Sequence, residues 1–139
     1  DKKGVHNSYK SPDSINAIDW SLKNKNAEQF GYYQQLIKLR KEHPAFRMTS
    51  AADIAKHIVF DKVKTPNVIS YSIKDNANGD QWKEIKLVFN GNNEAVTVSV
   101  PKGNWTVVAE DGKINADGLG ESKGGKVTVP ATSALILAR

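Results

Sequence analysis

From residue 58 onward, apolar residues alternate with polar ones. Of all features of the sequence, this alternation restricts the possible folds of the chain most strongly. Side chains two residues apart lie on the same face of a β-strand, so each alternating run predicts a strand with one apolar face. We therefore predict six to eight short strands. Their apolar members are Ile58 and Phe60; Ile69, Tyr71 and Ile73; Ile85, Leu87 and Phe89; Val96, Val98 and Val100; Trp105, Val107 and Ala109; Val127 and Val129; and Leu135 and Leu137.

Turn residues separate several of these runs. Asn90-Gly91-Asn92-Asn93 and Asp111-Gly112 supply residues that tolerate positive φ, as tight hairpin turns require. The strands beside them are expected to be antiparallel, and many short antiparallel strands favour a sandwich of two sheets. Residues Asp75–Asp80 and Asn115–Gly125 are predicted to be long surface loops.

The first fifty residues follow a different pattern. A polar, irregular segment precedes a predicted helix over residues 27–43, which Asn26 is expected to cap and Pro44 to end, because proline lacks a backbone N–H. We predict one domain over residues 1–50 and another over residues 51–139. The helix prediction depends on residues that recur at helical spacing: Phe30, Tyr33, Leu36 and Ile37.

Composition excludes some functions and leaves others open. No apolar run approaches the roughly 20 residues that span a bilayer, so no membrane partner is expected. The net charge is +5, but lysines are spread from Lys2 to Lys126 with acids between them, so no nucleic-acid partner is expected either. Residues 1–4 lead into no apolar signal region, and with no cysteine the localisation stays unknown.

Two motifs near the start resemble known sequences. Residues 7–20, NSYKSPDSINAIDW, resemble the segment N-S-Y-x-S-P-D-x-x-N-x-x-D-W that follows the eighth barrel strand of bacterial type I pullulanases. Residues 36–46, LIKLRKEHPAF, resemble the last barrel helix of the wider α-amylase superfamily. The later strands are similar to domain C of those enzymes. The resemblance implies a mainly β fold: a C-terminal antiparallel β-sandwich like domain C, preceded by a loop and one helix left over from a (β/α)8 barrel.

The resemblance also implies a function for the whole enzyme. A pullulanase hydrolyses α-1,6-glucosidic bonds in starch and pullulan, using carboxylates from barrel strands four, five and seven. Those strands would precede residue 1, and no D-x-R-x-D-like segment occurs here, so the chain alone is expected to be inactive. An acid–base pair of Asp13 and Asp19 is not favoured. The expected partners are the upstream barrel and, through it, an α-glucan; no cofactor is expected.

Three residues of the opening segment are predicted to bind substrate. Loops after barrel strands build the active-site face, so we expect Asn7, Tyr9 and Asp13 to line the sugar cleft. Tyr9 would offer its ring to a glucosyl unit, and the other two would bond sugar hydroxyls or hold neighbouring loops. The alternative that these three residues only stabilise the loop also stays open. Asp19 and Trp20 are expected to anchor the loop to the helix.

Two alternatives to this function remain. The first alternative is an independent carbohydrate-binding β-sandwich module. Exposed coplanar aromatic rings would distinguish such a module from a part of an enzyme. Trp105 is expected in the core, and Trp82 is a candidate exposed ring. The other alternative is α-1,4 hydrolysis or glycogen debranching. No metal is expected, because Ala77 breaks the calcium-loop pattern in residues 75–80 and the three histidines lack H-x-x-x-H spacing.

Overall fold

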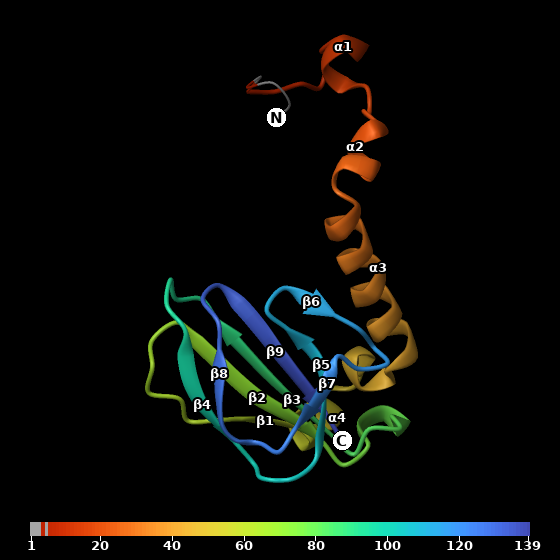
Figure 1. The fold of residues 1–139 in the computed structure, drawn as a ribbon. Helices are drawn as coiled ribbons and strands as arrows, with labels where there is room; N and C mark the ends of the chain where they lie inside the picture. Colours follow the sequence, from red (N-terminus) through yellow and green to blue (C-terminus); the bar gives the residue numbers. More distant parts are fainter. Residues whose placement is uncertain (1–3, 5) are drawn as a thin grey trace. The chain divides into compact units, whose positions relative to one another are not determined.

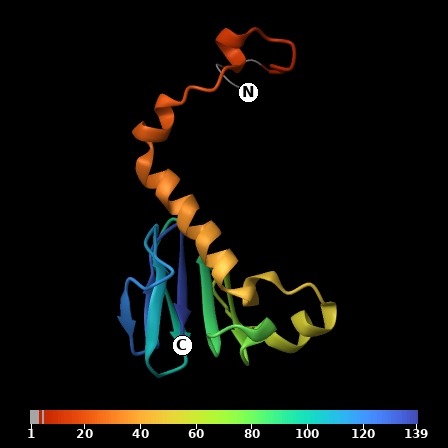
Figure 2. The same cartoon turned by 90° about the vertical axis from the view of Figure 1, so that its right-hand side faces the viewer.

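A computed structural model describes residue 4 and residues 6–139 (Figures 1 and 2). The chain divides into two compact units, residues 1–31 and residues 32–139. The predicted boundary between residues 1–50 and 51–139 stays a prediction. None of the described helices is long and apolar enough to cross a membrane.

The first unit contains short helices where we predicted an irregular segment. They are α1 (Asp13–Asn16) and α2 (Ser21–Lys25), and the long helix α3 (Ala27–Glu42) follows, which confirms the helix prediction. Asn26, expected to cap α3, is the C-cap residue of α2, and its side-chain NH2 donates to the Leu22 carbonyl at 2.9 Å. No described residue of this unit is buried.

The second unit is built on antiparallel sheets. The larger sheet has seven strands in the order β1-β2-β3-β9-β5-β6, with β7 also paired to β5, and the smaller sheet pairs β4 with β8. This confirms the prediction of a mainly antiparallel β-structure. The strands are β1 (Ile58–Phe60), β2 (Val68–Lys74), β3 (Glu84–Asn90), β4 (Val96–Val100), β5 (Trp105–Glu110), β6 (Lys113–Ile114), β7 (Gly120–Ser122), β8 (Gly125–Val129) and β9 (Ser133–Ala138).

One predicted hairpin turn is right and the other is wrong. Asp111 and Gly112 have positive φ, 49° and 71°, and join the antiparallel pair β5–β6. The Asn90–Asn93 segment instead carries the chain from β3 into the other sheet. The reason is the buried Asn90 side chain, whose NH2 donates to the carbonyls of Glu94 and Pro130, each at 2.8 Å. These bonds fix a crossing between sheets, so β3 pairs with β9.

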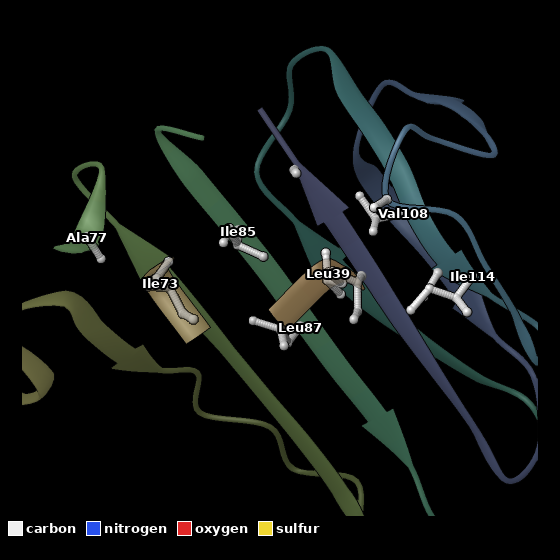
Figure 3. Packing of buried hydrophobic residues seen from close by; sticks show 12 residues of the cluster. Leu39, Ile73, Ala77, Ile85, Leu87, Val108 and Ile114 are labelled. Atoms are coloured by element: carbon white, nitrogen blue, oxygen red, sulfur yellow. The ribbon is translucent and has the colours of Figure 1, made fainter. Parts of the chain in front are cut away.

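The larger sheet has an apolar core on each face, because alternate side chains of a strand point to opposite faces. One core lies between the two sheets. Its residues from the larger sheet are Val88, Trp105, Val107, Leu135 and Leu137, and its residues from the smaller sheet are Val98, Val100 and Val129. The core on the other face holds Leu39 of α3, Ala45 of the 3-10 helix η2 (Pro44–Arg47) and Ala77 of the 3-10 helix η3 (Ala77–Gly79). Figure 3 shows Leu39 and Ala77 of this core against the strands, with Ile73, Ile85, Leu87, Val108 and Ile114.

Three local predictions need correction. Helix α4 (Ala51–His57) was missed, although the Ser50 Oγ accepts from the Asp53 N–H at 3.3 Å, a helix-start signal present in the sequence. The predicted loop Asn115–Gly125 contains β7, which pairs with β5. The predicted surface loop Asp75–Asp80 contains η3 and two buried residues, because Ala77 enters the core and Asp80 is hydrogen-bonded inside it.

Candidate ligand-binding surfaces

The opening segment holds the three predicted substrate-binding residues on an exposed, locally ordered loop. The Asn7 side-chain oxygen accepts from the Tyr9 N–H at 3.0 Å, so these two residues are brought together. Asp13 lies in the first turn of α1. The Asn16 side chain donates to the carbonyls of Ser8 and Ser11 at 2.7 and 3.0 Å and thereby fastens the loop to α1. Their binding of substrate stays a prediction.

Large side chains of this segment are strongly exposed. Tyr9 is 85% exposed and Trp20 is 73% exposed. The Asp19 carboxylate accepts from the N–H and the hydroxyl of Ser21, at 3.0 and 2.6 Å, and so satisfies a backbone donor at the start of α2. The rings are therefore presented by ordered backbone rather than buried within their own unit.

Helix α3 carries apolar side chains on more than one side. Leu39 is buried in the core of the second unit, and Leu36 packs against that core. Tyr33 and Ile37, one helical turn apart, are each 58% exposed. A helix that is apolar on both sides is usually buried on both sides.

A row of aromatic side chains crosses β1, β2 and β3. Phe60 lies opposite Tyr71 in the β1–β2 pairing, and their ring centroids are 5.2 Å apart. Tyr71 and Phe89 follow at 6.2 Å, with ring planes 25° apart. Phe60 is 67% exposed and Phe89 is 39% exposed, while Tyr71 is half-buried. Burial raises the pKa of the Tyr71 phenol.

The row leads into a groove of about 420 Å³ beside Phe89. Tyr32 and Phe89 contribute aromatic rings to it. The groove is also lined by Lys113 of the β5–β6 hairpin, by Thr132 of the β8–β9 turn and by Ser133, the first residue of β9. The groove therefore combines flat apolar surface with hydrogen-bonding groups. Sequence reasoning placed Phe60, Tyr71 and Phe89 on apolar strand faces but did not single them out, because their proximity depends on strand register.

A buried histidine–aspartate pair lies at the other end of the sheet face. The His43 Nδ1 and the Asp80 Oδ1 are 3.0 Å apart, and Asp80 also accepts from the N–H groups of Ala45 and Trp82 at 3.1 and 2.9 Å. Both side chains are almost completely inaccessible. This cluster joins η2 to the segment after η3, and its burial gives it a structural role.

The two tryptophans of the β unit have different environments, and neither is strongly exposed. Trp105 is 1% exposed, which confirms its expected place in the core. Trp82 was the candidate exposed ring, but it is half-buried and stacks on His43 with ring centroids 3.3 Å apart. His43 therefore occupies one face of the Trp82 ring.

A lysine lies buried between the sheets. Lys86 is 1% exposed, and its ammonium forms an ion pair with Asp61, which also accepts from the Ser70 hydroxyl. Burial by itself raises the pKa of the Asp61 carboxyl, but the bonds from Lys86 and Ser70 outweigh it and hold that pKa below its ordinary value. Among the described residues, no group of three histidine, aspartate or glutamate side chains is placed to hold a metal ion.

Comparisons with known proteins place these features in a family. Residues 54–113 match the family model described as the pullulanase all-beta domain. A pullulanase of Bacillus subtilis (strain 168) is 41% identical over 100 residues, which is 72% of this chain and 14% of that protein. The chain therefore spans about a seventh of the length of this curated relative.

Solved structures agree with this match. The pullulanase from Bacillus acidopullulyticus superposes with a TM-score of 0.92 at 40% identity, covering 99% of this chain and 17% of that one. The type I pullulanase of Bacillus subtilis strain 168, complexed with maltose, gives 0.88 at 33% identity, covering 99% and 19%. A pullulanase of Anoxybacillus sp. LM18-11 complexed with maltotriose gives 0.83 at 30% identity, covering 99% and 18%. This chain is thus homologous to the bacterial type I pullulanases and contains their all-beta domain.

Proposed function

We propose that this chain acts as the C-terminal part of a debranching enzyme that hydrolyses α-1,6-glucosidic bonds, and that it stabilises the catalytic barrel. The homology to pullulanases supports the reaction. The chain itself carries no D-x-R-x-D-like nucleophile segment, so the catalytic carboxylates belong to the barrel and the chain alone is inactive.

The observation that carries the stabilising role is the exposed stripe on α3. Tyr33 and Ile37 are each 58% exposed on a helix whose Leu39 is buried in the β unit. Covering a side chain of this size contributes about 1.5–3 kcal/mol. The stripe is therefore suited to pack against a second apolar surface, and we assign that surface to the barrel.

The opening loop is proposed to line the sugar cleft through Asn7, Tyr9 and Asp13. Tyr9 offers an exposed ring, and the loop that carries it is held by the Asn16 side chain. The relatives solved with maltose and maltotriose support α-glucans as the ligand class. Loops after barrel strands form the active-site face in this type of fold, which supports the same position.

A chimaera tests this proposal. The Bacillus subtilis relative would be produced intact, with its corresponding region replaced by this chain, and with that region deleted. We expect the chimaera to release reducing ends from pullulan, while the deletion variant is insoluble or unfolds at a lower temperature and loses activity. A deletion variant that keeps both its stability and its activity would overturn the stabilising role.

The cleft residues are tested in the same chimaera. We expect Tyr9→Ala to impair pullulan hydrolysis, mainly through KM, and Tyr9→Phe to keep most of the activity because the ring remains. An exposed apolar residue outside the loop and outside the aromatic row, as in Leu119→Ala, is the control for loss of stability. Unchanged kinetics in Tyr9→Ala would remove Tyr9 from the cleft.

The second candidate function is an independent carbohydrate-binding module. The exposed aromatic row Phe60–Tyr71–Phe89 is the observation that favours it. A module predicts that the deletion variant keeps its activity on soluble pullulan, whereas a stabilising domain predicts loss, so the chimaera experiment separates the two.

A further inference from the structure

We propose that the groove beside Phe89, together with the aromatic row of Phe60, Tyr71 and Phe89, is a binding surface for an α-glucan chain. This surface lies on the β unit and uses none of the residues assigned to the catalytic cleft. The choice of an α-glucan among carbohydrates rests on the proposed function.

The aromatic row suits sugar rings. One face of a pyranose ring is lined by C–H groups, which pack on the face of an aromatic ring, while the hydroxyls at its edge need polar partners. The ring centroids are 5.2 and 6.2 Å apart, so the three rings form one continuous aromatic row. Phe60 and Phe89, at its two ends, are 67% and 39% exposed and can contact a ligand.

The groove supplies the polar partners. The Lys113 ammonium has three N–H donors, and among the described residues that line the groove none is a carboxylate that would pair with it. The Ser133 hydroxyl donates to the Pro130 carbonyl at 2.8 Å, which leaves its lone pairs able to accept from a ligand hydroxyl. Flat rings beside a few convergent polar groups are typical of small-ligand sites.

Backbone strain at the groove is a second, independent observation. Thr132 lines the groove and has φ +47°, a left-handed conformation that is an outlier for a β-branched residue. Its N–H donates to the Asn92 carbonyl at 3.0 Å, which holds it there. Strained residues of this kind cluster at binding sites, where the surrounding structure maintains them because they place a group for a ligand. Thr132 is one of the residues that line the groove, and its hydroxyl donates to the Asn92 carbonyl at 3.5 Å.

A titration of the full 139-residue chain with maltoheptaose tests the proposal, because this chain lacks the barrel strands that would complete the cleft proposed around Asn7, Tyr9 and Asp13. We expect saturable binding, detected by calorimetry and by NMR shifts that include residues 113, 132 and 133. Phe89→Ala is expected to weaken binding about tenfold, equivalent to 1.4 kcal/mol. Phe60→Ala, on a far more exposed residue, is the second variant in case the first is poorly folded.

Controls separate this surface from others on the chain. Tyr33→Ala removes an exposed aromatic ring outside this surface and outside the proposed cleft, so it is expected to leave maltoheptaose binding unchanged. Cellohexaose is expected to bind less well. The proposal is overturned if maltoheptaose does not bind, or if binding survives in both Phe89→Ala and Phe60→Ala. It is also overturned if these variants alter only self-association in sedimentation, which would make the row a protein interface.

The outcome is distinguishable from failure of the proposed function. If the chain binds maltoheptaose but the chimaera is inactive, the groove proposal is supported and the proposed enzyme role is rejected. If the chimaera is active and stable but the chain does not bind maltoheptaose, the enzyme role is supported and the groove proposal is rejected.

Discussion

Trp20 in the first unit and Trp105 in the second show how differently the two units treat the same kind of side chain. Trp20 is 73% exposed, whereas Trp105 is 1% exposed and lies between two sheets. The described residues of the first unit have a regular backbone but no buried side chain, whereas the second unit closes two apolar cores. Hydrogen bonds within short segments thus organise the first unit, and only the second is stabilised by burial of its own apolar surface.

Replacing the two tryptophans gives the largest expected contrast. Trp105→Ala should lower the free energy of unfolding of the second unit by about 3–5 kcal/mol, because it leaves a cavity and removes the bond from the indole N–H to the Pro101 carbonyl. Trp20→Ala should change it by less than about 0.5 kcal/mol. Urea denaturation followed by far-UV circular dichroism measures both, and similar losses in the two variants would contradict the comparison.

Replacing aspartates in the two units gives the next contrast. Asp80→Ala should cost about 3 kcal/mol, because His43 and the N–H groups of Ala45 and Trp82 lose a shared acceptor inside the protein. Asp13→Ala alters an exposed residue and should have little effect on the same transition. The unfolding temperature of each variant decides the matter, and a stable Asp80→Ala protein would show that the buried pair is dispensable.

The smallest expected effect is a pH dependence that belongs to the second unit. The pKa of Asp61 is lower in the folded protein than its ordinary value of 3.8, so the folded state favours the ionised carboxylate. Its contribution to stability is therefore fully present above about pH 5 and is lost as the pH falls through the folded pKa. Denaturation curves between pH 6 and pH 3 should show falling stability.

Asp61→Asn is the matched control for this titration. The variant keeps a similar shape but does not ionise, so we expect a shallower loss of stability between pH 6 and pH 3 than in the unmodified chain. Equal slopes in the two proteins would assign the acid sensitivity to other carboxylates.

Much of the strand content was predictable because alternation is a local signal. The runs around Ile69, Ile85 and Val98 each became strands at the expected positions. The pairing was not predictable in the same way: Asn90-Gly91 has the composition of a hairpin turn, yet long-range bonds to the backbone near Pro130 make it a crossing between sheets. Register and sheet order depend on contacts between segments far apart in the sequence, which a local pattern does not contain.

The candidate sites also differ in whether a local sequence pattern predicts them. Asn7, Tyr9 and Asp13 were predictable only through a contiguous motif that resembles a known family. The aromatic row combines residues from three strands, and the groove adds Tyr32 and the β8–β9 turn, so both exist only after folding. The alternation in the sequence predicts an apolar face at Phe60 and Phe89 but not that this end of the face remains uncovered.

The position of β9 has a consequence for how the second unit acquires its structure during synthesis. Residues 133–138 form the strand between β3 and β5, so until the ribosome has released them both neighbours have an unsatisfied edge. The sheet is therefore completed late, by a strand that must insert between its two neighbours. The connections that close in that step are residues 91–132, from β3, and residues 111–132, from β5. If synthesis pauses before this segment emerges, the nascent chain exposes two unpaired strand edges. It then depends on chaperones to avoid aggregation.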